Sequence, residues 1–178
     1  MKLFKITDLS NTKIISILES EFSKIDDTNI IENYHPVYHK SAGNIFFILN
    51  AGRYAQGSYF VLLDDNGEFA CSAGWNHYTD DTALLLTRAY VSPRYRTKYL
   101  MAEYFLNQML DDSKSYANRW ITVNNYNISM YKWWQRSVEG KRPALFNNWP
   151  DIYKLFVPLG EKTVNNTLQF VVEYKGPN

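Results

Sequence analysis

A strand, a basic loop and a helix follow one another between Thr82 and Leu110, and this stretch constrains the fold more than any other. Residues from Ala83 to Val91 are rich in leucine and β-branched side chains, which predicts a strand. Ser92-Pro93 ends the strand, because proline fixes φ and donates no hydrogen bond to a ladder. Apolar side chains then recur at helical spacing, at Leu100, Met101, Tyr104, Phe105, Met109 and Leu110.

The loop between this strand and this helix is basic, with Arg94, Arg96 and Lys98. The N–H groups of the first helical turn have no intrahelical partners and carry the positive end of the helix dipole, so they attract phosphate groups. Two interpretations are open at this point. The loop is either an anion site or a solvated connection to an ordinary core helix.

A second strand leads into a second helix further along the chain. Trp120 to Val123 alternates as a strand, and the following asparagine-rich segment interrupts it. Asn127 is a suitable N-cap for a helix that carries apolar residues on neighbouring turns, namely Met130, Tyr131, Trp134 and Val138. Tyr131 therefore lies near the beginning of this helix.

Together the two units resemble the GNAT N-acetyltransferase superfamily. Its pyrophosphate loop reads hydrophobic-V-x-P-x-[RQ]-x-x-G-x-[GA], and AYVSPRYRTKYLM matches it here. Its second motif reads v-x-N-x-x-A-x-x-x-Y or a near variant, and TVNNYNISMY matches it. With the flanking strands, the resemblance covers nearly the whole chain. It implies an α+β fold with a mixed, mostly antiparallel central sheet, flanked by helices and containing a splayed strand pair.

The resemblance also implies an acyl-CoA-dependent N-acyltransferase, which moves the acetyl group of acetyl-CoA to an unidentified primary amine by direct attack in a ternary complex. In this family acyl-CoA lies between the splayed strands and against the helix that follows the first of them. The implied contacts are the backbone of the first strand, the loop, the first helical turn and the second helix, at Ala89, Tyr90, Val91, Arg96, Thr97, Lys98, Tyr99, Leu100, Met101 and Asn127.

Tyr131 is the implied catalytic acid, which protonates the departing CoA thiolate. A phenol suits that role because it stays protonated at neutral pH and can donate a hydrogen bond. The structural alternative is that Tyr131 packs in the core beside Trp133 and Trp134, and that Asn127 only caps its helix.

The match departs from the family pattern at two positions. Tyr99 and Met101 occupy the places where the family usually has its two loop glycines, although Arg96 stands at the expected first position. Glycine lets a backbone approach pyrophosphate closely. An alternative function is therefore a catalytically inactive GNAT-fold binding or interaction protein that no longer uses CoA.

The general base, the acceptor and any metal are less well defined by the sequence. Four titratable residues near the expected hairpin are equal candidates for the base, Glu68, Asp80, Asp81 and His77, and some members of the family use water instead. Aromatic residues before residue 55 either border the acceptor pocket or pack in the core, namely Tyr34, Tyr38, Phe46, Phe47 and Tyr54. His35 and His39 have a metal-binding spacing, but Pro36 interrupts a helix there, and we expect no metal.

Further strands are expected on both sides of the two motifs. Ser58 to Asp65 and Glu68 to Trp75 read as strands of a hairpin, joined by Asn66-Gly67, a pair suited to the positive φ of a tight turn. Cys71 lies inside the second of these strands, where a buried, inert thiol is expected. The meander continues through a break at residues 76–82 into the strand that ends at Val91.

The two ends of the chain are expected to complete the sheet. Met1 to Ile6 alternates as an edge strand, and residues 8–10 begin a helix whose inward positions are Ile14, Ile15, Ile17, Leu18 and Phe22. Asp151 to Leu159 and Thr167 to Tyr174 read as two more strands, with Gly160 to Asn166 as a long connection.

The length and charge of the chain set the broader class. Its 178 residues, 46% hydrophobic and 21% charged, fit a single GNAT-like domain spanning residues 1–178, as a monomer or homodimer. A net charge of +1 predicts no extended nucleic-acid surface. One cysteine, no apolar run of membrane-spanning length and no visible signal segment predict a cytoplasmic protein without membrane contact. The abundance of Asn, Lys, Ile and Tyr is typical of AT-rich genomes, including viral ones.

Overall fold

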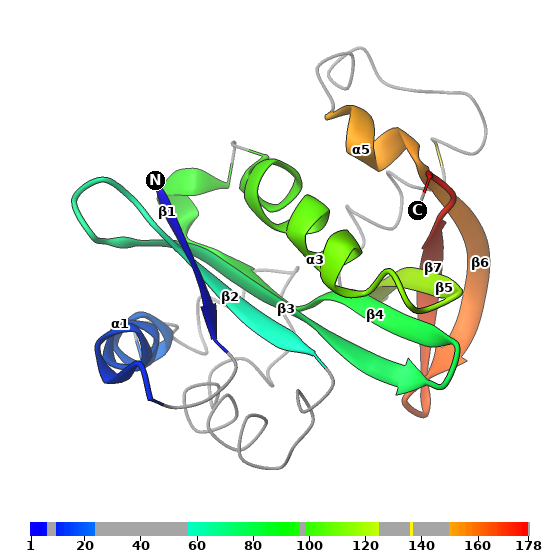
Figure 1. Cartoon of the computed structure of the whole chain (residues 1–178), viewed down its shortest axis with the longest axis horizontal. Coiled ribbons are helices and arrows are strands. Elements are labelled where there is room, and N and C mark those ends of the chain that lie inside the picture. The colour runs from blue at the N-terminus through cyan, green and yellow to red at the C-terminus, as the bar shows by residue number, and fades with distance from the viewer. Residues whose placement is uncertain (7–9, 24–56, 97–98, 125–135, 137–149, 178) are drawn as a thin grey trace.

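One seven-stranded sheet forms the body of the molecule (Figure 1). The computed structural model describes residues 1–6, 10–23, 57–96, 99–124, 136 and 150–177. The strand order is β1-β2-β3-β4-β5-β7-β6, and all neighbours are antiparallel except β4 and β5, which are parallel. This confirms the expected mixed, mostly antiparallel sheet. The strands are β1 (Lys2–Ile6), β2 (Ser58–Leu63), β3 (Phe69–Thr79), β4 (Thr82–Val91), β5 (Asn118–Asn124), β6 (Phe156–Val164) and β7 (Thr167–Tyr174).

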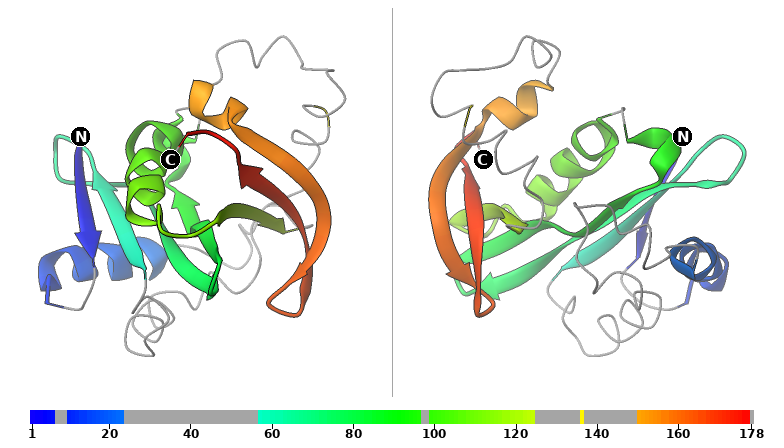
Figure 2. Two further views of the ribbon diagram at one scale, coloured as in Figure 1. Left: turned by 45° about the vertical axis from the view of Figure 1, so that its right-hand side comes forward. Right: turned by 180° about the vertical axis from the view of Figure 1, so that it is seen from behind.

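Helices cover both faces of this sheet. The helix α1 (Thr12–Ser23) lies on one side and α3 (Asn107–Asp112) on the other (Figure 2). A π-helical turn, η4 (Met101–Leu106), precedes α3 without a break, and together they form the helix predicted after the basic loop. Nothing in the helical spacing of the sequence indicated the π turn. A single 3₁₀ turn, η3 (Pro93–Tyr95), follows β4.

Alternation along β2 separates the two halves of the core. Phe60 and Leu62 are fully buried in the cluster that also contains Phe105 and Met109 of the η4–α3 helix. Their neighbours Tyr59, Val61 and Leu63 belong instead to a second cluster, together with Ile14, Ile15 and Leu18 of α1. Successive side chains of a strand point to opposite faces, so β2 is buried on both sides. The strand is therefore central to the packing although it lies next to the edge strand β1.

The α1 helix begins later than expected. Asn11 caps it, because its side-chain Oδ1 accepts a hydrogen bond from the N–H of Ile14 at 3.3 Å. Ile14, Ile15 and Leu18 are buried as predicted, and Ile17 is partly buried. The expected start at residues 8–10 falls partly outside the described residues, as does the side chain of Phe22.

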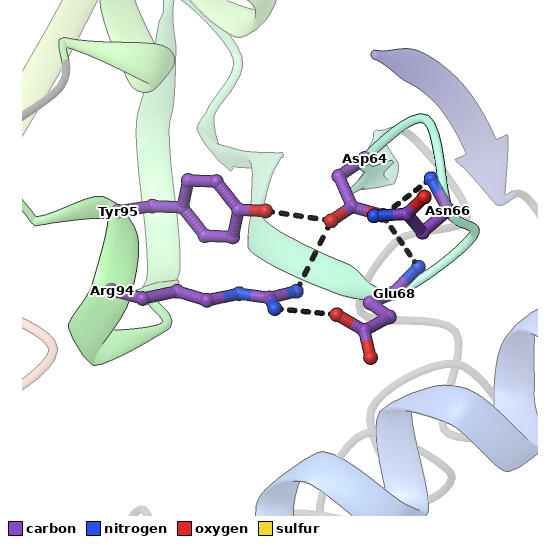
Figure 3. Close-up of polar contacts among 5 residues, drawn as sticks. All are labelled: Asp64, Asn66, Glu68, Arg94 and Tyr95. Carbon is purple, nitrogen blue, oxygen red and sulfur yellow. Dashed lines mark hydrogen bonds and ion pairs between the residues drawn. The ribbon is translucent and has the colours of Figure 1, made fainter.

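The β2–β3 hairpin is confirmed, but its turn is built differently from the expectation. The N–H of Gly67 donates to the Asp64 carbonyl at 3.0 Å, and the Asp64 N–H donates to the Glu68 carbonyl at 2.8 Å, which leaves three residues in the loop. Gly67 has φ +78°, whereas Asn66 has no positive φ. The Asp64 carboxylate stabilises this turn by accepting from the N–H groups of Asn66 at 2.9 Å and Glu68 at 2.8 Å (Figure 3).

The C-terminal prediction is wrong in two details. Residues 151–154 form a helical turn, α5 (Asp151–Lys154), in which the N–H of Tyr153 donates to the Pro150 carbonyl at 3.0 Å. The long connection from Gly160 to Asn166 does not exist, because Gly160 lies within β6 at φ +81°, beside a shift of register. Only Asn165-Asn166 joins β6 to β7, and both have positive φ, as a tight hairpin turn requires.

Candidate functional site

The two parallel strands β4 and β5 pair over only part of their length. Their ladder joins residues 82–85 of β4 to residues 118–121 of β5, and it ends at Leu85 and Ile121. Both strands continue beyond that point, β4 as far as Val91 and β5 as far as Asn124, where β5 pairs with β7 instead. Within the described residues, no ladder pair joins the last six residues of β4 to β5. This is the splayed strand pair that the resemblance implied.

Two residues with left-handed backbone lie immediately beyond the last paired position. Leu86 has φ 52° and Arg88 has φ 53°, in the middle of a strand and without being glycine. For residues with a Cβ atom this conformation costs of the order of 1 kcal/mol or more each, so the surrounding structure must stabilise it. Strain of this kind is concentrated at functional sites.

The register between β3 and β4 shows what the unusual backbone does. Ser72 pairs with Tyr90, and Gly74 pairs with Thr87, so two steps along β3 correspond to three along β4. The next pair is Asn76 with Leu84, which again sets two steps against three. One extra residue is thus present in β4 on each side of Thr87. Such bulges bend a strand and interrupt pairing, which explains why the ladder with β5 stops here.

Hydrogen bonds to main-chain carbonyls fix the end of β4 and the residues that follow it. The Ser92 N–H donates to the Ala70 carbonyl of β3 at 2.9 Å, and the Tyr95 N–H donates to the Ser92 carbonyl at 2.8 Å. The Arg96 side chain turns back, and its Nε donates to the Val91 carbonyl at 3.3 Å. Residues 92–96 therefore form a compact turn against the end of the sheet.

Arg94, the first basic residue of the loop, has ion-pair partners within the protein. Its guanidinium forms ion pairs with Glu68 and, at 3.3 Å, with Asp64, both in the β2–β3 hairpin (Figure 3). The Tyr95 hydroxyl donates to the same Asp64 carboxylate at 2.7 Å. We call these four residues the hairpin latch. It joins the turn after β2 to the turn after β4.

Contacts within the latch shift the pKa values of Asp64, Arg94 and Tyr95. The Tyr95 hydroxyl, the backbone N–H groups of the turn and the Arg94 charge together hold the pKa of Asp64 below its usual range. The Glu68 carboxylate raises the pKa of the Arg94 guanidinium. Hydrogen bonding to Asp64 raises the pKa of the Tyr95 phenol. The sequence does contain a signal for the role of Asp64, since an aspartate two residues before Asn-Gly commonly caps a turn. It contains no signal that Arg94 and Tyr95 would bind this aspartate.

The predicted cofactor contacts fall into three groups. Ala89, Tyr90 and Val91 occupy the end of β4, directly after the bulges. Leu100 and Met101 are buried, with 2% and 9% of their surface exposed, so their side chains pack in the core, whereas Tyr99 is 38% exposed. Four further predicted site residues lie outside the described residues, namely Thr97, Lys98, Asn127 and Tyr131.

The helical turn α5 contributes a buried phenol close to this junction. Tyr153 belongs to the same core cluster as Leu100 and Met101. Burial raises the pKa of its phenol, and nearby Tyr99 and Cys71 raise that pKa further. Cys71 is itself fully buried, which raises the pKa of its thiol, in line with the expected inert cysteine.

The structure places two of the candidate bases away from the end of β4. Asp81 accepts hydrogen bonds from the Thr79 and Thr82 hydroxyls at 2.6 and 2.8 Å, and these bonds lower its pKa. This turn precedes β4, at the opposite end of the strand from Val91. His77 pairs with Ala83 near the same end, with its Nδ1 3.3 Å from the Tyr116 hydroxyl. Glu68 belongs to the hairpin latch.

The described part of the chain contains neither a metal-binding cluster nor a membrane-spanning helix. No three His, Cys, Asp or Glu residues among those described are grouped as metal ligands would be. The aromatic residues expected to border an acceptor pocket, and the His35 and His39 pair, lie outside the described residues. Among the described helices, none has the length and apolar character needed to cross a membrane.

Comparisons with known proteins identify the fold. No protein-family model matches the sequence, and no curated protein resembles it significantly. Among solved structures, an acetyltransferase from Streptococcus agalactiae 2603 superimposes with a TM-score of 0.60 at 11% identity, covering 97% of each chain. A Salmonella typhimurium protein assigned as an acetyltransferase, solved with its cofactor acetyl-CoA, gives a TM-score of 0.56 at 13% identity and covers 100% of this chain and 95% of its own.

A third similar structure contains a polyamine as well as CoA. The spermidine N-acetyltransferase from Vibrio cholerae, in complex with CoA and spermine, gives a TM-score of 0.54 at 15% identity over 96% of this chain and 92% of its own. A Staphylococcus aureus acetyltransferase described as a GNAT family member gives a TM-score of 0.55 at 12% identity, over 98% of this chain and all of its own. These similarities show that the chain has the GNAT acetyltransferase fold over nearly its whole length.

Proposed function

From this fold we propose that the protein is an acyl-CoA-dependent N-acyltransferase that transfers an acetyl group from acetyl-CoA to a primary amine. The observation that supports this proposal best is the separation of β4 from β5 beyond Leu85 and Ile121. Leu86 and Arg88, the residues with left-handed backbone at the β4 bulges, follow directly. The resemblance assigns acyl-CoA to this opening between the strands. Similar structures that contain acetyl-CoA or CoA support the assignment.

The end of β4 has the properties that an acyl donor requires. An extended ligand can add to one side of a strand through main-chain hydrogen bonds, as in peptide recognition by strand addition. We assign these contacts to Ala89, Tyr90 and Val91. An N–H near Val91 would donate to the thioester oxygen and stabilise the negative charge that develops on it during attack. Bound acyl-CoA supplies the activated carbonyl for this reaction.

The substitution of the loop glycines is compatible with a phosphate site at the helix start. The side chains of Leu100 and Met101 are buried in the core, so they do not project into solvent at the first turn, where a helix start binds phosphate. Since the hairpin latch neutralises Arg94, we assign the cationic role to Arg96 and Lys98, beside the backbone of Thr97 and Tyr99.

We assign Tyr131 as the acid that protonates the departing thiolate, and Asn127 as a further contact to the donor. Changing Tyr131 to Phe should lower turnover by about a hundredfold, because a general acid contributes roughly 10² to 10⁴. Affinity for acetyl-CoA should stay nearly unchanged, since the ring remains. Release of CoA thiol, followed with acetyl-CoA and excess amine, measures the turnover.

Tyr126→Phe is the matched control for this substitution, because it removes the same hydroxyl from the same motif five positions earlier. It should retain near wild-type turnover. If Tyr131→Phe turned over as fast as this control, Tyr131 would not be the acid.

The acceptor is proposed as a primary amine that attacks the thioester directly. Holding both substrates in one complex supplies much of the rate acceleration. Spermidine and spermine are the first amines to test, because the Vibrio cholerae structure contains spermine with CoA. Turnover with any amine supports the proposal. The absence of both acetyl-CoA binding and turnover would favour the alternative, a GNAT-fold binding protein that no longer uses CoA.

A further inference from the structure

A buried tyrosine on β2 contacts the backbone of the β4 bulge across an intervening strand. The Tyr59 hydroxyl lies 3.1 Å from the Arg88 carbonyl and 3.0 Å from the Ser72 hydroxyl of β3. Tyr59 is 1% exposed and Ser72 is fully buried. A carbonyl can only accept, so the Tyr59 hydroxyl donates its proton to Arg88 and accepts from Ser72. The three groups form a buried polar chain from β2 to β4.

This contact requires two departures from regular sheet geometry. In a regular ladder the carbonyl of a residue such as Arg88 lies in the plane of the sheet and faces a neighbouring strand. Here the backbone of Arg88 is left-handed, at φ 53°, and its carbonyl is reached by a side chain that belongs to the α1 face. The hydrogen bond to Tyr59 thus satisfies a group that the bulge turns away from the ladder.

The second departure is a glycine between the two strands. Gly74 of β3 pairs with Tyr59 on one side and with Thr87, the residue before Arg88, on the other. Residues directly opposite one another in a sheet direct their side chains to the same face. Because Gly74 has no side chain, the ring of Tyr59 can cross β3 toward β4, and glycine in a strand often marks such a close approach.

We infer that Tyr59 is a positioning residue for the acyl-donor site, which holds the Arg88 bulge and thereby keeps β4 apart from β5. The inference rests on the proposed function for the ligand, whereas the bulge itself is a feature of the fold. Leaving the partly buried Arg88 carbonyl without this donor would favour backbone conformations other than the left-handed one. Tyr59 would then act through the backbone of β4, without touching the donor.

The test compares three variants by two measurements. Tyr59→Phe removes the hydroxyl that donates to the Arg88 carbonyl. Ser72→Ala keeps that hydroxyl but removes the hydrogen bond that it accepts from Ser72. Ile15→Val removes one methyl group from the same core cluster without affecting β4. The first measurement is native-state amide hydrogen exchange of residues 86–91 in the ligand-free protein. The second is the dissociation constant for acetyl-CoA.

Tyr59→Phe should accelerate exchange at residues 86–91 about tenfold and weaken acetyl-CoA binding about tenfold, as expected for a partly buried acceptor that loses its donor. Ser72→Ala should show a smaller effect of the same kind at the same residues. Ile15→Val should lower overall stability without a selective effect on this segment or on binding. These selective effects would not follow from a merely structural role of Tyr59.

Equal exchange at residues 86–91 in Tyr59→Phe and Ile15→Val would overturn the inference. Tyr59→Phe and Ile15→Val with the same acetyl-CoA affinity would remove its link to the donor site. A wild-type protein that does not bind acetyl-CoA would refute the proposed function instead, and the exchange comparison would still decide whether Tyr59 holds the bulge.

Discussion

Asp64 joins two separate turns of the chain through one carboxylate. It accepts from two backbone N–H groups of its own turn, from the Tyr95 hydroxyl and from the Arg94 guanidinium. Most of these interactions require the charged form, which explains why its pKa lies below the usual value. The Arg94 side chain is 47% exposed, so water and salt weaken its pairing with Asp64, and the latch orders the loop more than it stabilises the fold.

The latch should make part of the stability dependent on acid pH. Because the pKa of Asp64 is lowered in the folded state, its contribution is present above the unfolded value near 3.9 and is lost as the pH falls through the folded pKa. Asp64→Asn should therefore unfold more easily than wild type at pH 6, with the difference shrinking toward pH 2. Urea unfolding at several pH values measures this.

Asp65→Asn is the control for Asp64, because it removes one carboxylate from the same turn, where Asp65 pairs with the amino terminus of Met1. If Asp64→Asn and Asp65→Asn lowered stability by the same amount at every pH, the special role of the Asp64 hydrogen bonds would be disproved.

At the scale of elements, the helix formed by η4 and α3 anchors the junction that β4 leads into. Phe105 is fully buried in the middle of it and meets the ring of Phe60 from β2 edge to face, with 6.2 Å between ring centroids. The same helix carries the first-turn residues assigned to the phosphate site. Packing of Phe105 therefore positions that turn relative to the sheet.

Phe105→Ala should lower the free energy of unfolding by about 3 to 5 kcal/mol, because it removes buried surface and leaves a cavity. Asn107→Ala, on the exposed side of the same helix, should change it by less than about 0.5 kcal/mol. Urea denaturation followed by circular dichroism compares the two. A loss below about 1 kcal/mol for Phe105→Ala would show that this helix does not pack as described.

Local patterns in the sequence were sufficient to predict most elements of the fold. Proline at position 93, glycine at 67 and the strand-like apolar runs of β2 and β3 mark the strands and their ends by their own chemistry. The resemblance to the GNAT superfamily supplied the splayed pair. The prediction of a long connection from Gly160 to Asn166 was wrong, because a glycine can form a bulge inside a strand and two asparagines can form a tight turn.

The site was less predictable because its distinctive features depend on distant partners. The left-handed backbone of Leu86 and Arg88 has no signal in those residue types, and the Tyr59 contact spans 29 positions in sequence. The pairing of Arg94 with the hairpin likewise depends on the fold. The sequence alone does not show that the positive charge of Arg94 is balanced by Asp64 and Glu68. The assignments of Asn127 and Tyr131 stay predictions.

At the scale of the whole molecule, the sheet behaves as two halves joined by a short parallel ladder. One half contains β1 to β4 and carries α1, and the other contains β5 to β7. They are joined in the ladder by four residue pairs only among those described. The central claim is that the opening beyond this ladder binds the acyl-CoA donor.

Urea unfolding with and without acetyl-CoA tests this claim most directly. A ligand that binds only the folded state should raise the free energy of unfolding by about 3 kcal/mol at a hundredfold excess over its dissociation constant, and by about 1.4 kcal/mol for each further tenfold. ATP at equal concentration, which carries phosphates but no pantetheine thioester, should give a much smaller effect. An unfolding midpoint that millimolar acetyl-CoA leaves unchanged, or that ATP raises equally, would contradict the account.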